Sequence, residues 1–344
     1  MIKLKSKKML AAVCEKQGSP LSIKSVFIPE PKTNEILVKL ETCGVCHSDL
    51  HIRDGHEEIM SENLPIILGH EGVGKVVEVG ENSSRAWKIG ERVGLPWLYE
   101  TCRECKFCKI GREAYCSAQV ARSFDKNGCF AEFAICKSDY AIKIPKFLDP
   151  IQAAPKLCAG LTSWSANLRA AVNKNDVCLV IGCGGLGLYA IQIAKSLGAS
   201  VICLDTNLEK LSIALKYGAD HAFLSDLTAP KKIQEVGGAD VCINFVPSKS
   251  IWPIVEKSLN PMARVVLVAL MQETTDLSHM WMINGGYQIL GNSVGSRKEM
   301  EQFFDFSKHH TIKTPIREIK IKDVNKALDM LLQGKATEKM VITF

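Results

Sequence analysis

The sequence contains no apolar run long enough to cross a lipid bilayer. A transmembrane helix needs about 20 consecutive apolar residues, and polar or charged residues interrupt every apolar stretch of this chain before that length. The apolar stretch 9–13, which follows several lysines, is also too short for the core of a signal peptide. We therefore expect a cytoplasmic protein with no membrane partner.

Internal repeats and low-complexity linkers are absent as well, and the charge excess is small. The formal net charge is +6, and much of the excess lies close to the first residue, in Lys3, Lys5, Lys7 and Lys8. Such a group is typical of a solvated tail, and a nucleic-acid patch is the alternative. The chain of 344 residues exceeds what one hydrophobic core usually organises. We therefore expect two domains and no nucleic-acid partner.

Cysteine, in contrast, is abundant, with 14 residues. In a long chain without a secretion signal, clustered cysteines indicate metal binding or catalysis rather than disulfides. Others lie singly in apolar runs, where cysteine is usually a small buried hydrophobic residue. This interpretation applies to Cys14, Cys136, Cys178 and Cys203.

One cysteine cluster has the pattern C-x2-C-x2-C-x7-C and consists of Cys102, Cys105, Cys108 and Cys116. Four thiolates at such short spacing can complete a tetrahedral shell around zinc without long-range folding. That shell leaves no open position, so we expect a structural site. An iron–sulfur cluster also uses four cysteines, and unliganded thiols are the third possibility. Zinc is favoured because the segment is polar and would otherwise leave four thiols near water.

A second group of polar residues includes possible ligands of another metal: Cys46, His47, Ser48, Asp49 and His51, followed by His70 and Glu71. A catalytic zinc needs about three protein ligands and one open position. A histidine that binds metal usually donates its other ring nitrogen to a carboxylate, and Asp49 is available for this contact. A lone histidine is more often an ordinary surface or core residue, and spacing does not identify the third ligand.

The two halves of the chain differ in their patterns. Short strand-like runs such as 36–40 and 73–79, broken by glycine and proline, predict an irregular antiparallel β domain in the first 150 residues. From about residue 175, apolar runs alternate with helical patterns, which predicts a parallel sheet with helices on both faces. The expected strands are 177–181, 201–204, 241–246, 265–270 and 289–290, and the expected helices are 190–197 and 208–217.

A glycine-rich loop follows the first of these strands and opens a helix. Residues 182–187 fit the pattern G-x-G-x-x-G in the context that dinucleotide binding requires. Asp205 ends the next strand, where an acidic residue can accept hydrogen bonds from the ribose of NAD and repel the 2′-phosphate of NADP. A glycine-rich turn that serves packing alone is the alternative. The expected cofactor contacts of the loop are Gly182, Gly184, Gly185, Leu186 and Gly187.

The order of these features resembles that of the zinc-containing alcohol dehydrogenases in the medium-chain dehydrogenase/reductase family. The similarity covers nearly the whole chain. It is carried by 44–51 (GVCHSDLH), 68–74 (LGHEGVG), 94–97 (GLPW), the four-cysteine segment, 158–162 (CAGLT) and the glycine loop. The resemblance implies an α/β protein with three parts. A GroES-like, β-rich catalytic domain would span 1–155, with the structural zinc lobe at about 95–118. A Rossmann domain with a doubly wound parallel sheet would span 156–295, and 296–344 would return to the catalytic domain.

The resemblance also implies the roles of individual residues. It makes Cys46, His70 and Cys158 the catalytic zinc ligands, with Glu71 behind them or as an alternative ligand. Ser48 and His51 match the family's proton relay. The remaining matches concern the cofactor: His47 near the pyrophosphate, Thr162 beside the nicotinamide, Lys210 near the adenosine ribose, and Lys339 where many relatives carry a pyrophosphate-binding arginine. A lysine at that position keeps the charge but loses the bidentate fork.

The implied function is hydride transfer between a small alcohol, or its aldehyde or ketone, and NAD, with two zinc ions per chain. Two departures concern the substrate: 54–59 lacks the tryptophan that narrows the pocket of ethanol-preferring relatives, and 270–273 lacks the usual glycine and proline. A polyol or cinnamyl-type dehydrogenase of the same family is therefore an alternative. A non-enzymatic, zinc-stabilised NAD-binding protein is a further alternative. Loss of a zinc ligand or of the relay would favour it. By analogy we expect a homo-oligomer, either a dimer or a tetramer.

Overall fold

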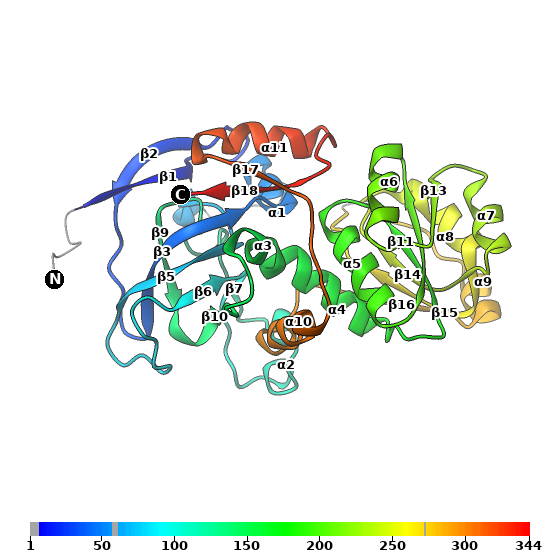
Figure 1. Ribbon diagram of the computed structural model, residues 1–344, viewed down its shortest axis with the longest axis horizontal. Helices are drawn as coiled ribbons and strands as arrows, with labels where there is room; N and C mark the ends of the chain where they lie inside the picture. The colour runs from blue at the N-terminus through cyan, green and yellow to red at the C-terminus, as the bar shows by residue number, and fades with distance from the viewer. Residues whose placement is uncertain (1–6, 57–60, 272) are drawn as a thin grey trace. The chain divides into compact units, whose positions relative to one another are not determined.

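The computed structural model describes residues 7–56, 61–271 and 273–344, and its chain divides into two compact units (Figure 1). The first unit comprises the chain up to Cys158, then Ser296–Lys308 and Pro315–Phe344. The second comprises Ala159–Gly295 and His309–Thr314. The short segment 309–314 belongs to the second unit because Gln192 bonds to both the carbonyl and the N–H of Lys313, at 2.7 and 3.0 Å.

The first unit is built on a seven-stranded sheet with the order β10-β6-β5-β3-β18-β17, in which β9 also pairs with β3. Its strands are β3 (Glu35–Gly44), β5 (Gly72–Val79), β6 (Arg92–Leu95), β9 (Phe133–Lys137), β10 (Ile142–Lys143), β17 (Ile316–Ile319) and β18 (Lys339–Thr343). The pairs are antiparallel, as expected, except for β17 and β18, which run parallel. The sequence analysis did not predict this parallel pair, because α11 (Val324–Leu332) connects two strands that carry no distinctive pattern.

Smaller elements complete the first unit. A three-stranded sheet has the order β2-β1-β4, and β7 pairs with β8. These strands are β1 (Lys8–Cys14), β2 (Ser22–Phe27), β4 (Ile66–Ile67), β7 (Leu98–Glu100) and β8 (Val120–Ala121). The α-helices besides α11 are α1 (His47–Asp54), α2 (Lys106–Lys109), α3 (Pro150–Pro155) and α10 (Arg297–His309). One hydrophobic core joins residues from β1, β3, β9 and α11, so the C-terminal segment is part of this unit.

The second unit has a six-stranded parallel sheet with the order β13-β12-β11-β14-β15-β16. This is the Rossmann order, in which the chain returns past its first strand to continue on the other side. The strands are β11 (Val177–Ile181), β12 (Ser200–Asp205), β13 (His221–Leu224), β14 (Ala239–Asn244), β15 (Leu259–Leu267) and β16 (Gln288–Gly291). The helices are α4 (Leu161–Arg169), α5 (Gly185–Ser196), α6 (Leu208–Lys216), α7 (Ala229–Glu235), α8 (Trp252–Ser258) and α9 (His279–Gly285).

Both faces of this sheet are covered. Successive residues of β11 enter two separate hydrophobic cores: Cys178 and Val180 contact one, and Leu179 and Ile181 the other. This explains why the strand is a continuous apolar run rather than an alternating one. The sequence analysis predicted β11 to its last residue but did not predict β13, an edge strand whose residues are only half-buried.

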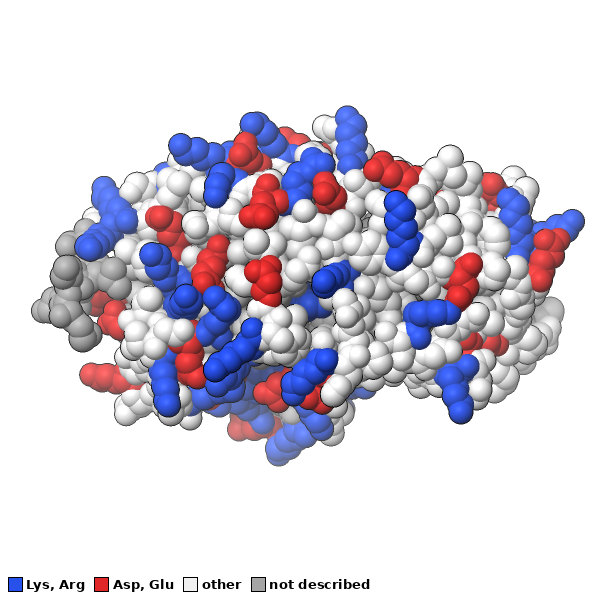
Figure 2. All heavy atoms as spheres, in the orientation of Figure 1, with Lys and Arg blue, Asp and Glu red and all other residues white. Residues whose placement is uncertain are grey.

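On the face drawn in Figure 2, the described residues carry charges of both signs. Figure 2 shows basic and acidic side chains interspersed over the visible face. Lys7 and Lys8 are exposed, whereas Lys3 and Lys5 lie outside the described residues. None of the helices in the described ranges is long and apolar enough to cross a membrane. The four cysteines predicted to be small core residues (Cys14, Cys136, Cys178 and Cys203) are indeed fully buried.

Candidate active site

Helix α1 begins at a buried carboxylate that joins two segments of the first unit. The N–H of Cys46, the N-cap residue, donates to Oδ2 of Asp49 at 3.0 Å. The other oxygen, Oδ1, accepts from the N–H of Gly69 at 3.0 Å and lies 3.1 Å from Nδ1 of His70. Asp49 therefore fixes the start of α1 and the orientation of the His70 ring together, as the sequence analysis anticipated for a metal-binding histidine.

Four buried side chains converge next to this carboxylate: Cys46, His70, Glu71 and Cys158. Their ligand atoms all lie within 4.8 Å of one another. The Sγ atoms of Cys46 and Cys158 are 3.9 Å apart, although the two residues are distant in sequence. Cys158 lies in a one-turn π-helix, Lys156–Gly160, between α3 and α4. Such π-turns occur frequently at functional sites, and this one brings the distant thiol to the cluster.

The cluster fits a zinc ion. Tetrahedral zinc with Zn–S bonds of about 2.3 Å places two sulfurs roughly 3.8 Å apart, close to the observed separation. Among the described residues, no group forms a hydrogen bond with Nε2 of His70, although this atom is fully buried. An orphaned buried nitrogen is costly unless something binds it. Two thiols and one imidazole are the donor set of a zinc site that leaves a position open.

The charges of the cluster favour the metal-binding thiolate of Cys46 but the protonated forms of Cys158 and His70, which would lose their protons to a bound metal. The hydrogen bond from Cys158 and the charge of Lys339 hold the pKa of Cys46 well below its usual value, despite burial. The same hydrogen bond, together with burial, raises the pKa of Cys158. Burial opposes the charge on His70, but Asp49 and the Cys46 thiolate outweigh it and raise the pKa of His70.

Glu71 and Lys339 form an ion pair behind the thiols. Nζ of Lys339 donates to Oε1 of Glu71 at 2.7 Å, and the side chains are only 7% and 0% exposed. Burial raises the pKa of Glu71 to about 7, although Lys339 acts in the opposite direction. Gly44 makes room for this carboxylate, because a Cβ at position 44 would lie 1.8 Å from Oε2 of Glu71. The family resemblance implies a pyrophosphate contact for Lys339, which stays a prediction; in the structure its amine donates to Glu71.

The expected proton-relay residues lie on α1. Ser48 follows the thiol ligand directly, and its Oγ is 3.9 Å from Sγ of Cys46. His51 is one turn further on, so it shares a helix face with Ser48. The ring centroid of His51 is 6.5 Å from that of His47, which is exposed.

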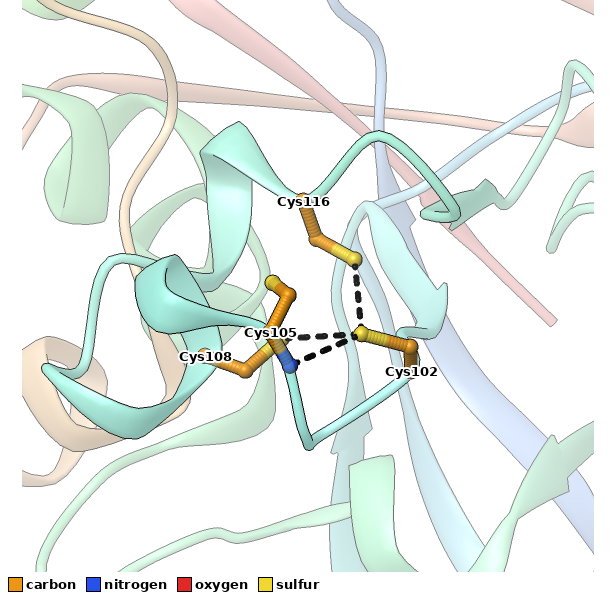
Figure 3. Close-up of side chains that lie close together, drawn as sticks. All are labelled: Cys102, Cys105, Cys108 and Cys116. Carbon is orange, nitrogen blue, oxygen red and sulfur yellow. Dashed lines mark hydrogen bonds between the residues drawn. The ribbon is translucent and has the colours of Figure 1, made fainter.

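The four cysteines of the lobe also converge (Figure 3). Cys105 is the N-cap residue of α2, and Cys108 lies within this helix. Cys116 follows a short 3-10 helix, Glu113–Tyr115. Sγ of Cys102 lies 3.9 Å from Sγ of Cys108 and 3.5 Å from Sγ of Cys116. The N–H of Cys105 donates to Sγ of Cys102 at 3.3 Å, and such backbone hydrogen bonds lower the pKa of Cys102 to about 7. This closed set of four thiols is suited to a structural zinc.

Residues outside the lobe support it, and the sequence analysis missed them. The N–H of Thr101 donates to the OH of Tyr140 at 2.9 Å. The Tyr140 OH and Oγ1 of Thr101 lie 2.6 Å apart and form a second hydrogen bond. Sγ of Cys108 donates in turn to this Oγ1 at 3.4 Å. The guanidinium of Arg297, at the start of α10, lies 4.1 Å from the Tyr140 ring centroid and pairs with Glu113 of the lobe. No spacing rule could have revealed these partners, because they are far from the lobe in sequence.

The glycine loop joins β11 to α5 in the second unit. Gly182 has a φ of 91°, which favours glycine. A Cβ on Gly187 would lie 1.8 Å from the carbonyl oxygen of Gly182. Gly184 is the N-cap of α5, and no atom would lie within 4 Å of a Cβ there. Gly185 and Leu186 form the first turn of the same helix, which leaves backbone N–H groups available to an anion.

Asp205 lies at the end of β12, beside this loop. Its Oδ2 accepts from the N–H of Cys183 at 2.8 Å, and its Oδ1 accepts from the N–H of Asn207 at 2.9 Å. Each oxygen keeps a second lone pair for a ligand hydroxyl. Lys210 lies in the first turn of α6, and Thr162 is buried in α4. The stretches singled out for pocket size, 54–59 and 270–273, include residues 57–59 and 272, which lie outside the described residues.

Comparisons with known proteins agree with this geometry. The protein-family model "Alcohol dehydrogenase GroES-like domain" matches residues 32–146, and the family model "Zinc-binding dehydrogenase" matches residues 185–309. An alcohol dehydrogenase of Geobacillus stearothermophilus is 34% identical over 336 residues, which cover 97% of this chain and 98% of that protein. A cinnamyl alcohol dehydrogenase of Sorghum bicolor matches with a TM-score of 0.87 at 27% identity over 98% of both chains. A CAD from Helicobacter pylori, complexed with NADP(H), matches with a TM-score of 0.87 at 28% identity over 98% of both chains.

Proposed function

The chain belongs to the zinc-containing alcohol dehydrogenases of the medium-chain dehydrogenase/reductase family, and from this premise we propose that it transfers hydride between a small alcohol and NAD. The observation that carries the proposal is the cluster of Cys46, His70 and Cys158 around an orphaned His70 Nε2. Every ligand and relay residue of the family's reaction is present. A scaffold protein without activity would have no need to retain them together.

Cys46, His70 and Cys158 would hold the catalytic zinc, with Glu71 held by Lys339 behind them. When bound, zinc supplies a Lewis acid that lowers the pKa of an alcohol hydroxyl. Asp49 keeps the His70 ring in place and favours the tautomer with its proton on Nδ1. This tautomer leaves the lone pair of Nε2 for the cluster. Ser48 Oγ would accept the proton of the alcohol, and His51 would carry it onward to solvent.

The glycine loop and Asp205 would hold the cofactor. NAD accepts the hydride when bound. The N–H groups at the start of α5 favour its pyrophosphate, and Asp205 offers acceptors to ribose hydroxyls while opposing a 2′-phosphate. Lys210 adds a positive charge in the first turn of α6. This charge is compatible with binding of either NAD or NADP. His47 and Thr162 are proposed to contact the pyrophosphate and the nicotinamide.

Two zinc ions per chain are proposed, the second in the closed set of four cysteines. The two sets differ in exposure: the catalytic set is buried, and three of the four lobe cysteines are partly exposed. Unliganded thiols in such a position would be open to oxidation. Elemental analysis of the purified protein tests this point directly.

A cinnamyl-type dehydrogenase is the second candidate function. It is favoured by the similarity to the Sorghum bicolor enzyme over nearly the whole chain and by the absence of tryptophan from residues 54–59. A screen of primary, secondary, aromatic and polyol alcohols, with NADH formation as the readout, tests both candidates. The highest kcat/KM with an aromatic allylic alcohol would replace the small-alcohol assignment, and turnover of no alcohol would refute both.

We also propose that the protein is a homo-oligomer, a dimer or a tetramer. Strand β16 is an edge of the sheet in the second unit, and the neighbouring helix α9 exposes Met280 and Ile283 by 72% and 77%. An edge strand, paired with β15 on one side only, beside exposed apolar side chains is suited to association with a second copy. Sedimentation of Ile283→Glu against the unmodified protein tests this surface: retention of the native mass in the variant would exclude it.

A further inference from the structure

Helix α1 ends in a Schellman motif that brings His51 and His56 together. The N–H of His56 donates to the carbonyl of His51 at 2.9 Å, and the N–H of Gly55 donates to the carbonyl of Ile52 at 3.3 Å. Gly55 has a φ of 80°, the left-handed conformation that this motif requires and that favours glycine. In such a motif the side chains of the two residues joined by the outer bond commonly contact each other. Here both are imidazoles.

The two rings form a path from the relay residue to solvent. Their centroids are 5.3 Å apart, with an angle of 47° between the planes. At this separation, nitrogens of the two rings are within reach of one hydrogen bond or one bridging water. His51 is half-buried and His56 is exposed. Imidazole exchanges protons near neutral pH, which suits it to this position.

We propose that His56 is the outer proton-transfer residue of the relay, an inference that rests on the proposed dehydrogenase function. During alcohol oxidation, an N–H bond of protonated His51 breaks as the proton bonds to the unprotonated ring nitrogen of His56. His51 is then neutral, and His56 releases the same proton to water or buffer. During aldehyde reduction, the proton follows the reverse path. No electron pair leaves either ring.

The charged groups around the pair are largely neutralised by one another. Nε of Arg53 lies 2.7 Å from Oδ1 of Asp54, and Nη1 of Arg53 lies 2.8 Å from Oδ1 of Asp329 on α11. Gln17, after β1, donates to the carbonyl of Ile52 at 2.7 Å and so packs against the same end of α1. The other charged residues on α1, on α11 and directly after β1 are Asp49, Lys326, Glu15 and Lys16. Lys326 pairs with Asp323, and Glu15 pairs with Lys24. Glu57 and Glu58 follow His56 and lie outside the described residues.

Single-turnover alcohol oxidation in weak buffer tests the proposal. The zinc-loaded enzyme is mixed with NAD and alcohol while NADH absorbance and a pH-indicator dye are recorded in parallel. His56→Gln should slow proton release by about threefold below neutral pH, a smaller effect than for a group that acts on substrate directly. Added imidazole should restore the rate, since a soluble imidazole can take the proton from His51. His309→Gln, an exposed histidine at the end of α10, is the matched control and should leave both signals unchanged.

The His51→Gln background separates a relay role from a structural one. If protons pass through His51 first, His56→Gln should add no further delay in that background. Histidine-labelled NMR of the zinc-loaded protein without cofactor gives a second readout: proton exchange between the two rings should be visible at the His51 ring signals and absent in His56→Gln. Proton release at the unmodified rate in His56→Gln, with His51→Gln slow, would overturn the inference and leave the proposed function intact. No alcohol turnover by the unmodified enzyme would instead refute the proposed function.

Discussion

Lys339 on the last strand, β18, donates a hydrogen bond to Glu71 beside the proposed zinc ligands, 268 positions earlier in the chain. The two groups are buried together, so each is the main compensation for the charge of the other. Removal of one partner from a buried ion pair commonly costs about 3–5 kcal/mol, whereas replacement of both can be nearly neutral. The pair therefore makes the stability of the catalytic cluster depend on the C-terminal segment.

Lys339→Met should destabilise the protein by about 3 kcal/mol, because it leaves the Glu71 carboxylate buried without its partner. Glu71→Gln should cost less, because the Lys339 ammonium left behind still lies near the Cys46 thiolate. The double variant should recover much of the loss. Urea unfolding of the four proteins in a double-mutant cycle measures the coupling, and additive losses would show that the contact contributes nothing.

Cys46→Ser should abolish turnover and lower the zinc content from two ions to one per chain, because it removes a ligand of the catalytic cluster only. Cys105→Ser should also leave one zinc but should chiefly lower the unfolding temperature. Elemental analysis and thermal unfolding of both variants check the separation. The idea is wrong if the unmodified protein contains one zinc, or contains iron.

Arg297→Met should accelerate loss of metal from the four-cysteine lobe. The substitution removes the charge that pairs with Glu113 and the contact with Tyr140, which in turn holds Thr101 against Cys108. Hydrogen bonds to charged groups contribute about 1.5–3 kcal/mol, so release to a chelator should be roughly tenfold faster or more. Arg112→Met, which breaks another ion pair of the lobe, the one to Glu299, without touching Tyr140, is the control. Equal release rates for the two variants would argue against a special role for Arg297.

His51→Gln should slow alcohol oxidation most at neutral and lower pH, where hydroxide cannot replace the relay. General acid–base groups contribute about 100- to 10,000-fold, and a relay residue remote from the substrate should fall at or below the low end. The pH profile of kcat/KM is the measurement. An unchanged rate and profile would mean that His51 only fills space.

Asp205→Asn should narrow the preference for NAD over NADP. Two unit charges about 4 Å apart interact by roughly 4 kcal/mol at an effective dielectric constant of about 20. Discrimination of about 100-fold or more by the carboxylate is therefore expected. Asparagine keeps an acceptor for the N–H of Cys183, so the glycine loop should remain in place, whereas Asp205→Ser shortens the side chain and tests the loop as well. If the unmodified enzyme used NADP as well as NAD, Asp205 would not have this role.

Local patterns in the sequence predicted much of the second unit and the four-cysteine lobe. The apolar run of β11, the glycines after it and the four cysteines of the lobe each report contacts made within a short stretch of chain. Asp49 was predictable as the partner of His70 because metal-bound imidazoles need a carboxylate. The edge strand β13 was not predicted, because its residues show neither the continuous apolar run of a buried strand nor the alternation of a half-buried one. The parallel pairing of β17 with β18 was not visible in any local pattern.

Contacts between distant segments account for the rest of what sequence reasoning did not predict. Nothing near Lys339 indicates that its amine binds Glu71, and nothing near Arg297 indicates that it supports the lobe. The third ligand, Cys158, could be selected among the many cysteines only through the family resemblance. Its place in the cluster depends on the π-turn Lys156–Gly160, a backbone irregularity that composition does not encode.

The two cysteine sites also differ in how much of the chain must exist before they can form. Fourteen positions separate Cys102 from Cys116, whereas 112 separate Cys46 from Cys158 and 268 separate Glu71 from Lys339. During synthesis on the ribosome, the lobe has all its thiols once residue 116 has emerged, long before the catalytic set is complete. Glu71 obtains its counter-ion only after the last strand is made. The order of translation would thus give the proposed structural site first access to zinc, and the proposed catalytic site would be complete with its ion pair only after the last strand has been made.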